Sequence, residues 1–162
     1  MAKSSLRRGS RQSIASFDVR VIALLRRWYI PLARVSLFVV YFWFGFLKLT
    51  GLSPASPLAE ALTAKTIGLQ WYDVLFVSLA ILECIIGVLF LIPRATRVAI
   101  VIMLLHMVLV CSPLVLLSSM VWQRPFVPTL EGQYIIKNIV LVAAAISVAA
   151  SVVPYIDQKK SR

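Results

Sequence analysis

The stretch that decides the fold runs from Val74 to Ile92 and reads VLFVSLAILECIIGVLFLI. It contains one charged residue, Glu83, and no proline. Because each helical residue adds about 1.5 Å of rise, a run of ~20 apolar residues is long enough to cross about 30 Å of hydrocarbon. We therefore predict that this stretch is a membrane-spanning helix.

Three other stretches of the chain have similar length and apolar character. Backbone amides cannot stay unpaired in lipid, so each stretch is predicted to be helical despite many β-branched residues. The whole chain agrees, because 60% hydrophobic and 14% charged residues make 162 residues too apolar for a soluble domain. The predicted fold class is all-α, an integral membrane four-helix bundle. Its spans are predicted at about 30–50, 74–92, 98–120 and 134–155.

The basic residues indicate on which side of the membrane the ends lie. Thirteen of the seventeen Lys and Arg residues fall in the amino-terminal segment, at Arg34 where the first span begins, in the connection around Arg94 and Arg97, and at the carboxyl end, against Lys65 and Arg124 in the other loops. Cytoplasmic loops carry the excess of positive charge, so both termini are predicted to be cytoplasmic. The predicted division is a basic cytoplasmic tail at 1–29, a four-helix domain at 30–156 and a basic cytoplasmic tail at 157–162.

Aromatic residues at the ends of the spans support the same orientation. They belong to the belts that form at membrane interfaces. In the first outer loop, residues 58–67 are predicted to form a short interfacial helix, and the second loop, 121–131, is predicted to be extended because of its two prolines. The inner belt comprises Trp28, Tyr29 and Tyr155, and the outer belt comprises Trp71, Tyr72, Trp122 and Tyr134.

The net charge of +11 concerns the membrane rather than nucleic acid, because the basic residues cluster at the ends of hydrophobic runs. The end of the amino-terminal tail has two readings that the sequence leaves open. Apolar residues between its arginines could form an amphipathic helix on anionic headgroups, or the tail could be disordered. The lipid bilayer is the one partner that the composition itself predicts.

Four ionisable residues lie inside or near the predicted spans, where each costs roughly 2.5 to 3.5 kcal/mol at the centre of a helix. They are Lys48, Glu83, His106 and Lys137. Helical periodicity places each on a stripe of its span, and turning all four stripes inward would gather them around a cavity open to the outer side. Three plainer readings stay open: a structural ion-pair cluster, lysines that snorkel to the headgroups, and a packed neutral histidine.

The same stripes contain further residues of interest. In the first span Arg34, Tyr41 and Lys48 recur at intervals of seven, with Phe38 and Gly45 between them. The other predicted stripes are Phe76, Ala80, Glu83, Gly87 and Phe90 in the second span, Met103, His106, Val110 and Pro113 in the third, and Gln133, Lys137, Val140, Ala144, Ser147 and Ser151 in the fourth. Gly87 would allow a backbone or a flat ligand to approach closely, and Pro113 is expected to kink its helix.

Four motifs in register resemble the DoxX-like family of small membrane proteins. They are RVSLF from Arg34, FWFGFLK ending at Lys48, ECIIGVL from Glu83, and YIIKNIVL, which contains Lys137 and Asn138. The branch most similar contains the inner-membrane protein of reactive-chlorine resistance. The resemblance implies a four-helix bundle in a bacterial cytoplasmic membrane and, for some relatives, a small subunit of a redox complex such as thiosulfate:quinone oxidoreductase. The polar positions that it implies are Arg34, Gly45, Lys48, Glu83, Gly87, Lys137 and Asn138.

Three functions compete at this point. The first is a quinone-linked or oxidative-stress accessory subunit, in which Lys48, Glu83 and Lys137 supply donors and a proton while Trp43 and Phe44 form an apolar wall. Its partner would be a redox subunit or a second copy, and a quinone is the candidate cofactor. The second is a non-enzymatic scaffold or assembly factor that docks through the tail or outer loops. The third is a transporter of protons or small solutes, which four helices without an inverted repeat make the weakest reading. The sequence shows no metal-binding spacing, and its lack of a cysteine pair or large soluble domain argues against independent catalysis.

Overall fold

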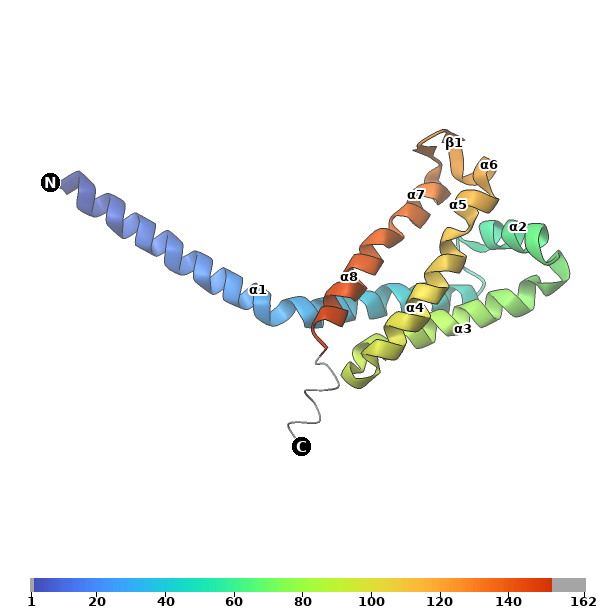
Figure 1. Ribbon diagram of the computed structural model, residues 1–162, viewed down its shortest axis with the longest axis horizontal. Coiled ribbons are helices and arrows are strands. Elements are labelled where there is room, and N and C mark those ends of the chain that lie inside the picture. The colour runs from blue at the N-terminus through green and yellow to red at the C-terminus, as the bar shows by residue number, and fades with distance from the viewer. Residues whose placement is uncertain (1, 153–162) are drawn as a thin grey trace. The chain divides into compact units, whose positions relative to one another are not determined.

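A computed structural model describes the backbone of residues 2–152 and the side chains of residues 16–152. The predicted carboxyl-terminal tail at 157–162 and Tyr155 of the inner belt lie outside these residues. The chain divides into two compact units between Leu32 and Ala33, and each is described by itself. Helices dominate both units (Figure 1).

The first unit belongs to a single helix, α1, which runs from Ala2 to Leu49 and therefore continues into the second unit. The backbone of the predicted amino-terminal tail is helical from Ala2 onward, in agreement with the helical reading. Pro31 lies inside α1, where it has no N–H to donate to the preceding turn. The apolar side chains of this unit are exposed, with Phe17 at 70% and Leu25 at 60%.

The second unit is built on the carboxyl-terminal part of α1 and three further long helical segments. These are α3 (Tyr72–Leu91), preceded by the 3₁₀ turn η1 (Leu69–Trp71); α4 (Thr96–Cys111), preceded by η2 (Pro93–Ala95); and α7 (Leu130–Ile136) followed by α8 (Asn138–Ala150). Their core takes Leu37 and Tyr41 from α1, Ile86 and Phe90 from α3, Ala99, Met103 and Met107 from α4, and Ala145 and Val148 from α8. Four helices thus share one apolar core.

The remaining elements lie between these long helices. They are α2 (Ser56–Thr66), α5 (Pro113–Leu116), α6 (Ser118–Val121) and a hairpin of β1 (Trp122–Arg124) and antiparallel β2 (Val127–Pro128). A short helix is present where one was predicted at 58–67. The loop predicted to be extended over 121–131 is extended only in its two short strands, with a turn between them and helical residues at its ends. Pro113 marks a one-residue break between α4 and α5, because a proline has no N–H and clashes with the preceding turn. The third span ends at Leu116, short of the predicted Met120, because the backbone leaves the helical conformation at Leu117.

Hydrogen bonds tie these short elements together. Lys65 Nζ in α2 donates to the carbonyl of Leu116 at 2.6 Å, and Trp122 Nε1 donates to the carbonyl of Leu114 at 3.0 Å. Thr129 caps α7 by accepting from Gly132 N, and its hydroxyl donates to the carbonyl of Met120. Carbonyls of α5 and α6, which have no partner within these short helices, therefore find partners in the surrounding loops.

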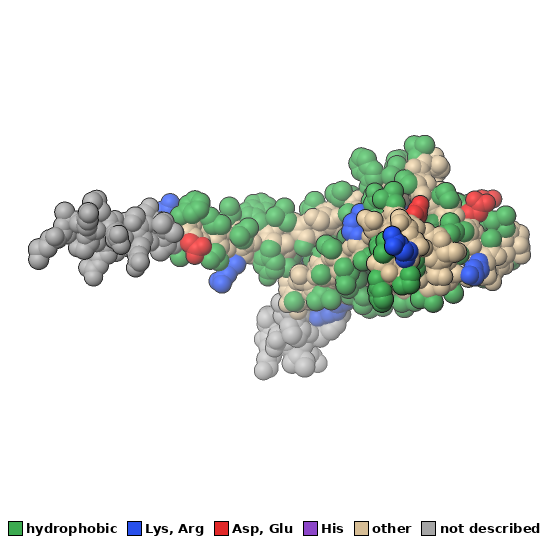
Figure 2. Space-filling model, turned by 90° about the horizontal axis from the view of Figure 1, so that it is seen from above, with side chains coloured by type: hydrophobic (Ala, Val, Ile, Leu, Met, Phe, Trp, Pro, Cys, Tyr) green, Lys and Arg blue, Asp and Glu red, His purple; other side chains and the backbone are tan. Residues whose placement is uncertain are grey.

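Within the described residues, four helical segments are long and apolar enough to cross a membrane: 16–49, 69–91, 93–116 and 130–150. Only 17–28% of each is buried inside the structure, so most of its apolar surface faces outward. Figure 2 shows hydrophobic side chains over much of the surface of one face. A soluble monomer rarely exposes so much apolar surface, and the class of multi-pass membrane proteins accounts for it.

Candidate functional site

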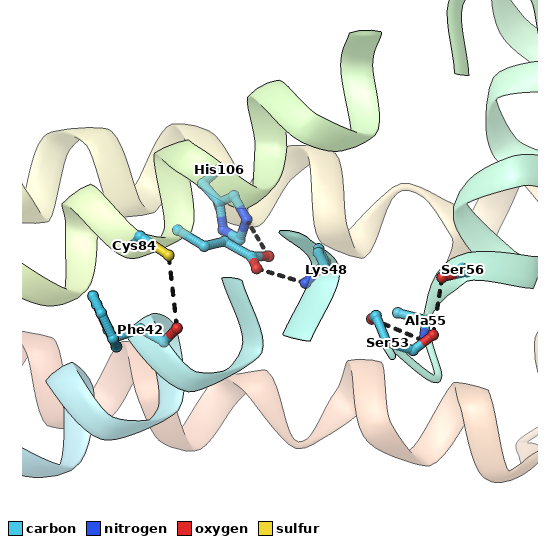
Figure 3. A network of polar contacts seen from close by, with 8 residues as sticks. Phe42, Lys48, Ser53, Ala55, Ser56, Cys84 and His106 are labelled. Atoms are coloured by element: carbon cyan, nitrogen blue, oxygen red, sulfur yellow. Dashed lines mark hydrogen bonds and ion pairs between the residues drawn. The ribbon is translucent and has the colours of Figure 1, made fainter. Parts of the chain in front are cut away.

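Three side chains from three helices meet inside the second unit, and we refer to Lys48, Glu83 and His106 as the polar cluster. Lys48 Nζ in α1 lies 2.5 Å from Glu83 Oε2 in α3, and His106 Nε2 in α4 lies 3.1 Å from Glu83 Oε1. In Figure 3 the dashed lines from Lys48 and His106 mark these two contacts. Each of the two carboxylate oxygens therefore has its own partner.

The polar cluster is almost closed to solvent, since the side chains of Lys48, Glu83 and His106 are 8%, 7% and 3% exposed. Moving a charge out of water costs several kcal/mol per ion unless a partner and further hydrogen bonds compensate. The lysine and the carboxylate neutralise one another, and the histidine satisfies the second oxygen. The arrangement can hold opposite charges in an apolar core and can pass a proton between a carboxylate and an imidazole.

The helix faces that hold the cluster follow the predicted stripes in three of the four spans. All five residues of the predicted α3 stripe are buried. Tyr41 and Gly45 are buried on α1, while Met103, His106 and Pro113 are buried in α4 and α5. The 3.6-residue period therefore identified the inward side of these helices.

The fourth stripe is wrong, and Lys137 does not join the cluster. Lys137 is exposed and its Nζ lies 4.5 Å from the centre of the Tyr134 ring. Because Lys48 and Glu83 already balance in charge, a second buried lysine would add an unpaired positive charge to the core. The buried face of this span consists instead of Gly132, Ile135, Ala145 and Val148, with Asn138 half-buried.

Ser147, also on the predicted inward stripe, is exposed for a related reason. Its hydroxyl donates to the carbonyl of Ala143 in the preceding turn at 3.0 Å. A serine that bonds to its own helix needs no partner in the core. The assumption that polar residues turn inward therefore fails where the helix satisfies them locally.

The two stripe glycines bring α1 and α3 into direct contact. A Cβ atom on Gly45 would lie 2.7 Å from the Ala80 carbonyl oxygen, and one on Gly87 would lie 2.9 Å from the Phe42 nitrogen. Of the two neighbours predicted for Gly87, a backbone or a flat ligand, the structure places the backbone of α1 against it. Small residues at a helix crossing let the backbones approach closely, and this approach brings Lys48 within reach of Glu83.

Arg34 lies away from the cluster and has a structural role. Its Nη1 donates to the carbonyl of Phe90 at 3.0 Å. Phe90 belongs to the last turn of α3, whose final carbonyls have no partner within the helix. Arg34 therefore completes the carboxyl end of α3 and fixes it against α1.

An open apolar groove of about 340 Å³ lies along α1 and α3 beside the cluster. Trp43 and Phe44, the predicted apolar wall, do not line this groove, and their side chains are 63% and 48% exposed. The α3 residues that line the groove, Ile81, Cys84, Ile85 and Val88, follow an i, i+3, i+4, i+7 pattern beside the Glu83 stripe, and this pattern could have predicted the groove. The lining residues are Phe42, Leu49, Ile81, Cys84, Ile85, Val88 and Leu89.

The groove offers little polar chemistry of its own. The Cys84 thiol donates to the carbonyl of Phe42 at 3.7 Å, and the remaining lining side chains are apolar. No residue of the polar cluster lines it. Elsewhere in the described residues, no group of three or more His, Cys, Asp or Glu side chains is placed to hold a metal ion.

The fold and the polar cluster together define a class: a multi-pass helical protein whose apolar four-helix core contains a charged cluster. Comparison of the chain with protein-family models, curated proteins and solved structures finds no match.

Proposed function

We propose that the chain is an integral protein of the bacterial cytoplasmic membrane, crossing it four times with both termini in the cytoplasm. The apolar exposed faces of the four long helices support insertion. The orientation rests on the positive-inside rule. Arg34 contacts the carboxyl end of α3, and the chain continues from there to the basic residues Arg94 and Arg97, which this rule assigns to the cytoplasmic side. Lys65, which the rule assigns to the outer side, contacts the Leu116 carbonyl at the other end of the third span.

Cysteine labelling of intact cells tests this orientation. Phe126, at the tip of the hairpin, is 94% exposed, so Phe126→Cys is expected to react with a membrane-impermeant maleimide added outside. Arg26→Cys, in the exposed basic segment, is expected to react only after the membrane is opened. The wild-type protein with its native Cys84 and Cys111 provides the background. If Arg26→Cys but not Phe126→Cys is labelled in intact cells, the proposed orientation is wrong and the termini lie outside.

We further propose membership of the DoxX-like family, on the four motifs that carry the resemblance. Their residues have definite tasks in this protein. Lys48 and Glu83 form the buried ion pair, Gly45 and Gly87 allow the helix contact beneath it, and Arg34 completes α3. Lys137 is the exception, because it is exposed.

Within that family, we propose that the protein is a small membrane subunit or accessory of a quinone-linked redox or oxidative-stress-defence complex. The observation that carries the proposal is the buried Lys48–Glu83–His106 cluster. Placing an ionisable group inside a membrane helix costs free energy, so such a group is the first candidate for a functional site. Redox reactions of quinones consume or release protons, and a carboxylate next to an imidazole can hold one inside the bilayer.

A quinone head does not fit the cluster as it is paired. The donors of the cluster, Lys48 and His106, already contact Glu83. All three side chains are also nearly inaccessible to solvent. The apolar groove along α1 and α3 presents no free donor to a ring carbonyl. We therefore assign the cluster a proton- and charge-holding role in the complex, and place ring binding on no residue of this chain.

Quinone-dependent electron transfer in native membranes tests the proposal. Glu83→Gln keeps the size of the side chain but removes its charge and its capacity to take up a proton as a carboxylate. We expect a loss of at least tenfold in the rate, and a similar loss for Lys48→Met.

Lys137→Met is the matched control, because it removes a lysine that is exposed and outside the cluster. Its rate should stay close to wild type. If Glu83→Gln and Lys48→Met are inserted in the membrane at wild-type levels and electron transfer is unchanged, the redox proposal fails and the cluster is structural.

A further inference from the structure

Two polar atoms next to the cluster have no hydrogen-bond partner in the described part of the chain: Tyr41 Oη and His106 Nδ1. Tyr41 and His106 are only 4% and 5% exposed, so bulk solvent does not compensate for the missing bonds. Buried polar atoms nearly always find a partner, in the protein or in ordered water. Each of these two atoms therefore needs a partner that the described side chains do not supply.

The chemistry of the two atoms is complementary. A carboxylate only accepts hydrogen bonds, so the 3.1 Å contact with Glu83 Oε1 places the proton of the imidazole on Nε2. A neutral ring then has a lone pair on Nδ1. Charge balance favours the neutral ring, because Lys48 and Glu83 already sum to zero and a protonated His106 would leave a net positive charge in the core. Tyr41 has a hydroxyl proton to donate.

The two rings lie against one another. Their centroids are 5.5 Å apart with an interplanar angle of 62°, an edge contact between α1 and α4. The donor and the acceptor thus belong to adjacent side chains, but they form no direct hydrogen bond with each other. A small hydroxylic molecule that accepts from one and donates to the other would satisfy both.

We infer that a water molecule binds at Tyr41 and His106, accepting a hydrogen bond from Tyr41 Oη and donating one to His106 Nδ1. It extends the polar cluster into a chain of Lys48, Glu83, His106, water and Tyr41. A role for this site in holding a proton for quinone chemistry rests on the proposed function, whereas the binding of water does not.

Nitrogen-15 NMR of histidine-labelled protein in lipid nanodiscs tests the inference. His106 is the only histidine in the chain, so its two ring nitrogens need no further assignment. We expect one protonated nitrogen and one unprotonated nitrogen, the latter shifted by an accepted hydrogen bond and showing magnetisation transfer from water. Tyr41→Phe, which keeps the ring, should remove most of that hydrogen-bond shift. Tyr29→Phe, an exposed tyrosine of the same helix, should leave it unchanged.

Each contrary outcome is distinct. Two protonated ring nitrogens, no transfer from water to the unprotonated nitrogen, or an unchanged shift in Tyr41→Phe would each overturn the inference. If Tyr41→Phe does not fold, the inference is decided by two measurements on the wild-type protein: which ring nitrogen is protonated, and whether the other receives magnetisation from water. Because the spectrum requires no electron transfer, the water site can be found in a protein whose redox role has failed, and the two failures remain separable.

Discussion

Glu83→Ala is expected to destabilise the protein by about 3–5 kcal/mol, because it leaves a buried lysine without its counter-charge. Lys48 is 8% exposed in its side chain and lies 2.5 Å from the carboxylate. His106 would lose its acceptor in the same step. The measurement is the free energy of unfolding in mixed detergent micelles, followed by circular dichroism as the denaturing detergent is increased.

Two further variants identify the cause. Glu60→Ala, an exposed glutamate of α2, should change the free energy of unfolding by less than about 0.5 kcal/mol. Lys48→Met combined with Glu83→Leu removes both charges, and we expect it to recover most of the loss, because apolar residues of similar size can replace a buried ion pair. A loss below about 1 kcal/mol for Glu83→Ala would mean that the ion pair does not form in the membrane.

The combined variant also separates stability from activity. If it folds as well as wild type and still fails to support quinone-dependent electron transfer, the charges are there for function. If it folds and supports transfer fully, the cluster serves only to hold the helices in register. A buried ion pair is by itself weak evidence for stability, which makes this distinction informative.

Gly45→Ala is expected to cost about 1–3 kcal/mol, the range seen when a methyl group is forced into a tightly packed core. The new Cβ would lie 2.7 Å from a backbone oxygen of α3, which cannot rotate away as a side chain can. The helices must separate, and the Lys48–Glu83 contact one turn further along should lengthen. Unfolding in the same micelles measures the cost.

Val88→Ile is the matched control, since it adds one carbon at an exposed position beside Gly87. It should have little effect. Gly87→Ala should resemble Gly45→Ala, because its Cβ also meets backbone. The double glycine variant should cost less than the sum, since the first substitution already separates the helices. Additive losses would indicate that the two glycines do not share one helix contact.

Periodicity predicted the candidate site where the helices run without interruption. The α3 stripe was predicted in full because its residues keep one helical register from Phe76 to Phe90. Tyr41, Lys48 and His106 were found in the same way. The distance between Lys48 and Glu83 was beyond sequence reasoning, because it depends on how closely two glycines let α1 and α3 approach.

The inward face of the fourth span was mispredicted because polarity was taken as a sign of burial. Both polar side chains find partners on their own helical segment: Lys137 lies over the Tyr134 ring, and the Ser147 hydroxyl donates to the Ala143 carbonyl. Whether a polar side chain needs the core depends on the charge already there, which only the assembled bundle reveals. The beginning of α1 was also beyond the sequence, because its two readings had equal support.

The end of the third span at Leu116 has a consequence for how this protein tolerates insertions. Lys65 from one connection and Trp122 from another bond carbonyls of α5, so each of these connections holds the end of a helix. Lengthening either one would remove a bond that the helical end needs. Epitope tags and evolutionary insertions should therefore be accommodated poorly at this end of the molecule, although loops elsewhere usually accept them.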